Sequence, residues 1–486
     1  MKSGATHVPC PLRAAAIASP VAPAVIDTGG ALTYVELDLR VTTTEEKIAE
    51  FGFGPGDRIA LYLPKDELYF VLLLALTRSG CIVCPLSTRL PPRAVAPLLH
   101  RISCRSLISS DEELLRATDA GIRKLRPEKL LAHEPAARDR AQGSEPLHLA
   151  LDRPATIVFT SGSAGSPKAA LHTFGNHYYS ALGSNANIDL APGDRWLHSL
   201  PLYHVGGLSI LFRCLLAGAT VALPEPGAPL GKAITESGAT HVSLVSTQLL
   251  RLLREEDFAP GRLRAILLGG GPIPVPLVDE AVTRGLPIHT SYGLTEMASQ
   301  VTATPPGASR EELGTSGRLL PHREISISDD GEILVRGETL FSGYVNSDIV
   351  DRSLDAGGWF RTGDLGELDA DGCLLVRGRK DNLFISGGEN VQPEEIEEAL
   401  CRLESVEEAV VVPIPDTEFG FRPVAFVRTL EGAAGLGDLA RALELRLPRF
   451  KVPVAFYGWP EGAGGMKLDR ASFRERARRL LGEGRG

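Results

Sequence analysis

The stretch TSGSAGSPKAALHT, residues 160–173, combines glycines, hydroxyl side chains and one lysine directly after the apolar run Ala155 to Phe159. Gly162 and Gly165 let neighbouring backbone N–H groups point into one concavity, which is what the binding of phosphate oxygens requires. Lys168 adds a mobile positive charge. The hydroxyl groups available to a triphosphate belong to Thr160, Ser161 and Ser163. The same composition is typical of a solvated turn, and the Walker pattern G-x-x-x-x-G-K-[ST] does not occur in the chain, so these residues alone leave both interpretations open.

Five motifs further along the chain carry residue types suited to nucleotide and acid chemistry. They are PLYHVGG (201–207), SYGLTE (291–296), WFRTGDLG (359–366), GRKDNLFISGGEN (378–390) and GGMKLDR (464–470). In this order and at these intervals, the six stretches resemble the adenylate-forming superfamily of acyl-CoA synthetases, adenylation domains and luciferases, over nearly the whole chain. The resemblance implies an AMP-forming acid–thiol ligase that uses ATP, Mg²⁺ and coenzyme A. In such an enzyme a carboxylate attacks the α-phosphate of ATP, giving an acyl-adenylate and pyrophosphate, and a thiol then displaces AMP.

The resemblance assigns nucleotide-binding roles within three of these motifs. Glu296 matches the family's magnesium ligand, and a hard carboxylate suits a phosphate-bound Mg²⁺. Tyr292 would stack on adenine, although a buried core tyrosine at a strand end is an equally ordinary interpretation. Asp364 would accept the ribose hydroxyls, and Arg379 would assist at the ribose or phosphate end. The remaining nucleotide-binding positions that we expect are Gly270, Gly271, Gly293 and Thr295.

The resemblance also implies residues for catalysis and for movement between the two half-reactions. Lys467, with Lys168, would stabilise the charge that develops on the α-phosphate and the attacking carboxylate. Asp381 occupies the family's hinge position, where rotation of a small domain exchanges the two reaction faces. Gly387 and Gly388 match a segment that borders the pantetheine tunnel, although a simple turn explains a Gly-Gly pair equally well.

Three positions depart from the family pattern. Met466 separates Lys467 from the preceding glycines, whereas the family usually places glycine directly before this lysine. Ala164 stands where the family usually has Thr or Ser, and Ala169 where it usually has Gly. We therefore expect the phosphate loop to lack one hydrogen bond and some backbone freedom.

The stretch GGLSILFRCLLAGATV, residues 206–221, holds a single charge, Arg213, in an apolar helix directly after His204. A buried guanidinium is costly unless it reaches solvent, pairs with a protein carboxylate or binds an anionic ligand. Here the resemblance narrows to the 2-succinylbenzoate–CoA ligases of menaquinone synthesis, in which an arginine at this position binds the benzoate carboxylate. His204 would then meet the reacting carboxylate. Ser299, Gln300 and Gly269 are expected to line the same pocket.

Three alternatives stay open beside this substrate. The chain could be a ligase for another aromatic or medium-chain acid, or an acyl-AMP ligase that serves a carrier protein. A non-catalytic regulator that binds nucleotide is the third. The two ligase alternatives share the ATP chemistry of the main hypothesis, and only the acid or the acyl acceptor differs.

The elements that must position these residues alternate between strands and helices. DRIALYLP, ELYFVLLLALTRSG and CIVCPLS, within residues 57–88, read as strand, helix and strand. Similar strands recur at THVSLVS, GRLRAILLGGG and LPIHTSYG. We expect an α/β fold with a large N-terminal body of mixed parallel sheets covered by helices. The last hundred residues predict a small, mobile α+β domain whose first helix begins at Pro393, and the charged GRKDN segment divides the chain into domains 1–380 and 381–486.

Composition excludes several other classes of protein. The chain has 486 residues and a formal net charge of -9, which argues against binding to nucleic acid or to an anionic membrane. The longest apolar run, Tyr69 to Leu76, is far too short to span a bilayer. Prolines interrupt the alanine-rich start, which makes a poor secretory signal, so we expect a cytoplasmic enzyme without membrane insertion. The seven scattered cysteines read as buried thiols, and a homo-oligomer is compatible with the sequence.

Overall fold

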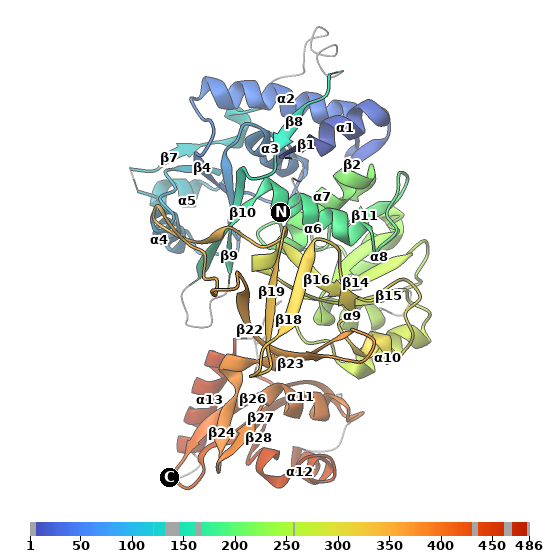
Figure 1. Cartoon of the computed structure of the whole chain (residues 1–486), viewed down its shortest axis with the longest axis vertical. Helices are drawn as coiled ribbons and strands as arrows, with labels where there is room; N and C mark the ends of the chain where they lie inside the picture. Colours follow the sequence, from blue (N-terminus) through green and yellow to red (C-terminus); the bar gives the residue numbers. More distant parts are fainter. Residues whose placement is uncertain are drawn as a thin grey trace.

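The computed structural model describes residues 6–119, 121–131, 145–160, 167–255, 258–429, 436–460 and 469–483 (Figure 1). The largest apolar cluster contains residues of both large sheets and of the helices between them, among them Ile59, Phe70, Leu208 and Val221. This cluster joins the two large sheets, and further apolar clusters pack around β13 and β14 (within residues 241–268), around β4 to β6 (within residues 58–109) and around β19 (residues 332–337). No helix within the described ranges is both long enough and apolar enough to cross a membrane.

An eight-stranded sheet forms around the predicted β-α-β unit. β4 (Arg58–Tyr62), α3 (Glu67–Arg78) and β5 (Ile82–Pro85) occupy the predicted segments. α3 begins where the Asp66 side chain accepts a hydrogen bond from the backbone N–H of Tyr69 at 2.9 Å. The strand order is β21-β20-β10-β9-β5-β4-β6-β7, parallel from β9 to β7 and antiparallel from β9 to β21. The other strands are β6 (Ser106–Ser109), β7 (Arg123–Leu125), β9 (Pro154–Thr160), β10 (Lys168–Thr173), β20 (Gly343–Asn346) and β21 (Ile349–Asp351).

A nine-stranded sheet holds the other predicted strands. Its order is β17-β16-β15-β14-β13-β11-β12-β2-β3, and the run from β15 to β2 is parallel. Its strands are β2 (Pro23–Asp27), β3 (Gly30–Thr33), β11 (Arg195–Leu197), β12 (Thr220–Ala222), β13 (His241–Leu244), β14 (Ala265–Leu268), β15 (Ile288–Leu294), β16 (Ser299–Ala303) and β17 (Arg318–Leu319). The three motifs THVSLVS, GRLRAILLGGG and LPIHTSYG contain β13, β14 and β15.

Helices cover both sheets, as Figure 1 shows. α6 and α7 carry long buried faces within the core, and α7 is buried along nearly its whole length because its sequence is almost entirely apolar. The helices of the body besides α3 are α1 (Pro11–Ala18), α2 (Tyr34–Glu50), α4 (Pro92–Arg101), α5 (Glu112–Ala117), α6 (Phe174–Asn185), α7 (Val205–Ala217), α8 (Leu230–Ser237), α9 (Ser246–Leu253) and α10 (Val275–Thr283). A short ladder pairs β1 (His7–Pro9) with β8 (His148–Ala150).

Two smaller sheets follow along the chain. A four-stranded antiparallel sheet has the order β18-β19-β22-β23, and a five-stranded sheet contains β25-β24-β27-β26 with β28 beside β27. The elements coloured orange and red lie together at one end of the molecule (Figure 1). Their bounds, with those of the four-stranded sheet, are β18 (Arg323–Ile327), β19 (Glu332–Gly337), β22 (Phe360–Leu368), β23 (Leu374–Arg379), β24 (Phe384–Ser386), β25 (Glu389–Val391), α11 (Pro393–Cys401), β26 (Val406–Asp416), β27 (Gly420–Thr429), α12 (Leu436–Glu444), β28 (Phe456–Gly458) and α13 (Arg470–Glu483).

The fold class expected from the sequence is confirmed. The nine-stranded sheet is parallel in the middle and antiparallel at both edges, and the eight-stranded sheet is parallel from β9 to β7 and antiparallel from β9 to β21, which is the mixed arrangement that the strand pattern predicts. α11 begins at Pro393, and its residues Ile396 and Leu400 are fully buried on one face. Helical spacing of apolar residues therefore located this helix from sequence alone.

Candidate active site

The two ends of the predicted phosphate loop lie side by side on β9 and β10, two neighbouring interior strands of the eight-stranded sheet. β9 ends at Thr160 and β10 begins at Lys168, and these two residues are register partners. Five residues that the sequence analysis discussed lie between them, outside the described residues: Ser161, Gly162, Ser163, Ala164 and Gly165. Ala169 is 1% exposed and pairs with Phe159 in a regular strand without a positive φ angle. The strand therefore does not use the conformations that only glycine allows, and Ala169 costs no backbone freedom here.

Lys168 and Glu296 both contact Tyr344 of β20. The Lys168 Nζ atom lies 4.7 Å from the centroid of the Tyr344 ring. The Tyr344 hydroxyl donates to Glu296 Oε1 at 2.5 Å. Burial, followed by the nearby Glu296 carboxylate, raises the pKa of Tyr344 well above its ordinary value, so the phenol stays protonated. This arrangement leaves Glu296 Oε2 to a cation, and Mg²⁺ is typically held by one or two carboxylates together with phosphate oxygens.

A second chain of contacts runs from Tyr292 through Asp364 to Arg379. The Tyr292 hydroxyl donates to Asp364 Oδ2 at 2.6 Å, and Arg379 Nη1 donates to Asp364 Oδ1 at 2.8 Å. Tyr292 is 9% exposed and packs in an apolar cluster, so it has features of both interpretations that the sequence left open. The structure thus brings together three residues predicted to contact the nucleoside.

Glu332 supports the turn that carries Asp364. Its side chain is buried, and Oε1 accepts a hydrogen bond from the backbone N–H of Gly363 at 2.9 Å. Its Oε2 lies 2.6 Å from Arg361 Nη2 and 3.1 Å from Lys380 Nζ. Burial raises the pKa of Glu332, but the two cations outweigh this effect and lower the pKa overall. One buried carboxylate therefore fixes the Asp364 turn and the residue beside the predicted hinge.

Arg213 is 1% exposed and, within the described part of the chain, bonds only to neutral groups. Its Nη2 donates to Gln300 Oε1 at 2.9 Å and to Ser299 Oγ at 3.1 Å, and its guanidinium lies 5.1 Å from the Trp196 ring centroid. It forms no ion pair with any carboxylate of the described residues, and its Nε and the Gln300 Nε2 have no hydrogen-bond partner among them. Burial lowers the pKa of Arg213 to about 10. Two unused donors beside an unpaired buried cation fit an anionic acceptor.

Arg323 is a second buried cation, and it contacts β16, the strand that carries Ser299 and Gln300. The sequence analysis did not identify it. Its Nε donates to the Gln300 carbonyl at 2.6 Å, and its Nη2 donates to the Ser180 carbonyl at 3.0 Å. Within the part of the chain that the structure describes, it too forms no ion pair with a carboxylate. Burial, followed by the neighbouring Arg213, lowers the pKa of Arg323 to about 9. Arg213 and Arg323 therefore place two buried positive charges beside Gln300.

His204 and the glycine loop lie next to the ends of elements of the large body, His204 before α7 and the loop after β14. His204 immediately precedes α7, with its ring centroid 4.8 Å from that of Tyr203. Gly269, Gly270 and Gly271 follow β14 directly. Gly293 lies in β15, and the carbonyl of Thr295 accepts a hydrogen bond from His172 Nε2 of β10 at 2.7 Å. That last contact ties the turn of Glu296 to the strand of Lys168.

The residues predicted for the hinge and for the second half-reaction, and Lys467, all follow Arg379 in the chain. Gly387 and Gly388 join β24 to β25 as a two-residue turn with φ angles of 60° and 86°. Two successive positive φ angles define a type I′ turn, so turn geometry explains both glycines. Asp381 is exposed, with Oδ2 3.6 Å from Arg379 Nη2. Lys467 and Met466 lie outside the described residues, but Arg470, which follows, is held by Glu397.

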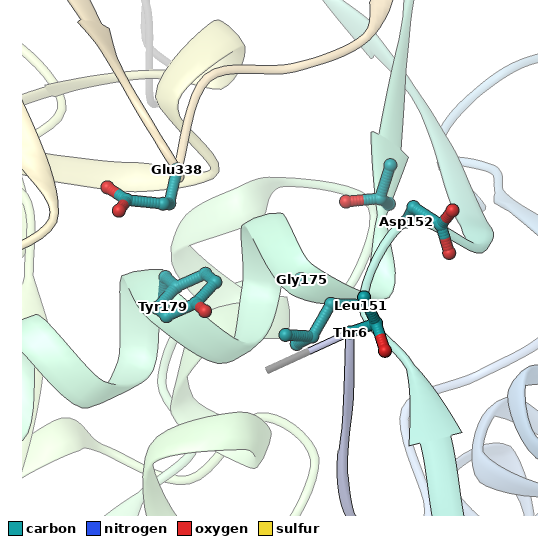
Figure 2. A pocket seen from close by; sticks show the side chains of 7 residues that line it. Thr6, Leu151, Asp152, Gly175, Tyr179 and Glu338 are labelled. Atoms are coloured by element: carbon teal, nitrogen blue, oxygen red, sulfur yellow. The ribbon is translucent and has the colours of Figure 1, made fainter. Parts of the chain in front are cut away.

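A surface hollow of about 320 Å³ lies elsewhere, beside the start of α6 (Figure 2). It is lined by Thr6, Leu151, Asp152, Thr173, Gly175, Tyr179 and Glu338. None of these residues belongs to the predicted site. The candidate site is therefore defined by the polar contacts above.

Family models match most of the chain. The model described as AMP-binding enzyme matches residues 12–345, and the model described as AMP-binding enzyme C-terminal domain matches residues 395–461. The chain belongs to the AMP-binding enzyme family. The resemblance stated from the sequence motifs is thereby confirmed.

Two curated relatives of this AMP-binding enzyme carry the same name. The chain is 34% identical to a 2-succinylbenzoate–CoA ligase of Bacillus licheniformis, over 89% of this chain and 92% of the relative. It is also 34% identical to a 2-succinylbenzoate–CoA ligase of a Geobacillus species, over 93% of this chain and 94% of the relative. The expected enzyme class, an AMP-forming acid–CoA ligase, is confirmed by these relatives.

Solved structures agree over the same length. The o-succinylbenzoate CoA synthetase of Bacillus subtilis, in complex with the acyl-adenylate intermediate OSB-AMP, superposes with a TM-score of 0.86 at 32% identity, covering 97% of this chain and 99% of that one. The same synthetase in complex with ATP and a magnesium ion has a TM-score of 0.83 at 33% identity, covering 93% and 96%.

Proposed function

We propose that this AMP-binding enzyme joins 2-succinylbenzoate to coenzyme A, with 2-succinylbenzoyl-CoA, AMP and diphosphate as products, in menaquinone biosynthesis. The observation that carries the substrate is Arg213, a buried cation that bonds only to neutral groups among the described residues, while its own Nε and the neighbouring Gln300 Nε2 are unused donors. A second carboxylate on the acid would supply the missing negative charge through charge-assisted hydrogen bonds. The ring carboxylate would accept from Arg213 and Gln300, leaving the succinyl carboxylate to react near His204.

In the first half-reaction the chain's residues hold the nucleotide and balance its charge. Lys168, with the backbone of the loop before it, would bind the phosphates, and Lys467 would stabilise the negative charge that grows on the α-phosphate. Asp364 and Arg379 would bind the ribose, and Tyr292 would pack against the base. Mg²⁺ bound at Glu296 would neutralise phosphate oxygens.

For the second half-reaction we propose domains of residues 1–380 and 381–486, with the hinge at Asp381. Rotation there would withdraw Lys467 and bring the Gly387–Gly388 turn toward the pantetheine arm. The contacts that cross this boundary, Arg379 with Asp381 and Arg254 with Glu407, are among those that such a rotation must rearrange. We place the reaction in the cytoplasm, which is supported by seven cysteines that form no disulfide.

Pyrophosphate release tests this assignment. The purified chain is given ATP, Mg²⁺ and one acid from a panel that contains 2-succinylbenzoate, 4-oxo-4-phenylbutanoate, benzoate and a medium-chain fatty acid, with and without CoA. We expect the highest kcat/KM with 2-succinylbenzoate and dependence of the full reaction on CoA. Preference for another acid, or acyl transfer to a carrier protein but not to CoA, would replace the assignment with one of the ligase alternatives. ATP binding without pyrophosphate release from any acid would favour the regulator.

A further inference from the structure

Tyr344 lies between two groups of opposite charge that do not touch each other. The Lys168 ammonium sits over the ring, and the Glu296 carboxylate accepts from the hydroxyl of the same side chain. Lys168 and Glu296 are both among the described residues and form no ion pair with each other. Lys168 contacts the face of the Tyr344 ring, and Glu296 contacts its hydroxyl. Without this ring, the lysine ammonium and the glutamate carboxylate would be within reach of one another.

The backbone around Tyr344 joins the strand of Lys168 to the turn of Glu296. Tyr344 is the register partner of Ala170 in β10. The N–H of Phe341 donates to the carbonyl of Glu296 at 2.8 Å, and the N–H of Ser342 donates to the carbonyl of Leu171 at 2.8 Å. The segment 341–344 therefore connects the strand of Lys168 to the turn of Glu296, and it fixes the position of the Tyr344 ring.

The two contacts of Tyr344 support each other. A phenol that donates its proton toward a carboxylate becomes richer in electrons, and an electron-rich ring attracts a cation more strongly. The hydroxyl also occupies Oε1 of Glu296, so the other oxygen keeps a fixed direction. A direct ion pair between Lys168 and Glu296 would instead neutralise the two charges that are needed to bind the phosphates and Mg²⁺.

We propose that Tyr344 is a positioning residue that keeps Lys168 and Glu296 apart, the lysine available to phosphate and the carboxylate to Mg²⁺. This role rests on the proposed use of Mg²⁺ and ATP at the site, but not on the identity of the acid. Tyr344 holds the two charges in the arrangement that the nucleotide and metal require before either is bound.

Two substitutions separate the roles of hydroxyl and ring. Tyr344→Phe keeps the ring and removes the hydroxyl, whereas Tyr344→Leu removes both. The dissociation constant of ATP is measured by calorimetry with Mg²⁺ and again with EDTA. Tyr344→Phe should weaken binding with Mg²⁺ about tenfold, because a hydrogen bond to a charged group is lost, and should leave Mg²⁺-free binding nearly unchanged. Tyr457→Phe, a tyrosine of the five-stranded sheet that packs on Phe426, is the matched control and should change neither value.

The leucine variant provides a rescue experiment. In Tyr344→Leu, Glu296 should capture Lys168 and weaken Mg²⁺-free ATP binding, and adding Glu296→Gln should release the lysine and restore that binding. Glu296→Gln alone should not strengthen Mg²⁺-free binding. Equal losses with and without Mg²⁺ in Tyr344→Phe, or no rescue in the double variant, would overturn the proposal. If the leucine variant does not fold, the Mg²⁺ dependence of the phenylalanine variant decides. Failure of wild-type turnover with 2-succinylbenzoate would count against the substrate and leave this result standing.

Discussion

Replacing Arg213 with methionine separates substrate recognition from stability. Methionine is long and flexible enough to fill most of the volume of the arginine side chain, but it carries no charge. The substitution removes the contacts with Gln300, Ser299 and Trp196. It also removes a cation that is 1% exposed and has no carboxylate partner among the described residues.

The substitution removes both the cost of burying a charge and the stabilising contacts of the guanidinium, and these two effects on the free energy of unfolding nearly cancel. Burial lowers the pKa of Arg213 to about 10, and one pKa unit corresponds to about 1.4 kcal/mol, so keeping the guanidinium charged in the folded protein costs about 3 kcal/mol. Because this pKa lies below the ordinary value, the charged form is favoured in the unfolded chain and the cost is fully present at pH 7. Two hydrogen bonds and one cation–π contact return about 1 kcal/mol each. Arg213→Met should therefore change the free energy of unfolding by less than about 1 kcal/mol, whereas breaking a buried ion pair costs about 3–5 kcal/mol.

Catalysis should respond very differently. Removing one partner of a buried charged contact with the ring carboxylate costs about 2–5 kcal/mol, so kcat/KM for 2-succinylbenzoate should fall about 30- to 4,000-fold. For 4-oxo-4-phenylbutanoate, which lacks the ring carboxylate, kcat/KM should stay within about threefold of wild type, because the contact is not made.

Pyrophosphate release with both acids and urea unfolding measure these quantities. Arg264→Met, at a half-exposed arginine paired with Asp194, is the control and should leave the ratio of the two kcat/KM values unchanged. Equal loss of kcat/KM on both acids, or destabilisation of Arg213→Met by more than about 3 kcal/mol, as for a buried ion pair, would refute the reasoning.

Three further outcomes are expected. Lys467→Ala should abolish adenylation but spare CoA transfer from supplied acyl-adenylate. Equal loss of both steps, when each half-reaction is assayed separately, would contradict its assigned role. Glu397→Gln leaves Arg470 without its closest carboxylate partner and should lower the free energy of unfolding by about 3 kcal/mol in urea, whereas an unchanged value would show that the pair adds nothing. Burial lowers the pKa of His172 from 6.5 to about 4, so between these pH values the unfolded chain binds a proton that the folded chain does not. Stability should fall there by about 1.4 kcal/mol per pH unit for this residue as pH decreases, and a flat pH series would exclude the effect.

Local signals made part of the fold predictable. The β4-α3-β5 unit was located from its apolar runs and from Gly80 at the end of the helical segment, because glycine commonly follows the last turn of a helix. The start of α11 followed in the same way from Pro393 and from apolar spacing. Such signals act within a few residues, so they can be recognised in the sequence without knowledge of the tertiary structure.

The missed residues depend on contacts between distant segments. Arg323, in the sequence HREISI, has the pattern of a solvated strand end, yet it is buried because Gly183 of α6 leaves room for it. A side chain at that glycine would place its Cβ 2.2 Å from Arg323 Nη1. The aromatic residue in GYVN predicts only a strand, and its contact with Glu296 exists because β20 joins the sheet beside β10. No local pattern records which strand becomes a neighbour.

The position of β10 between β9 and β20 sets an order of assembly. β9 and β10 are made one after the other and can pair at once, but β20 is synthesised only after the whole nine-stranded sheet. Until then the outer edge of β10 has unpaired backbone groups and Lys168 lacks the ring beneath it. A fragment that ends before β20 would expose that edge to pairing with other chains. The nucleotide site is therefore completed late, when a distant strand closes the sheet.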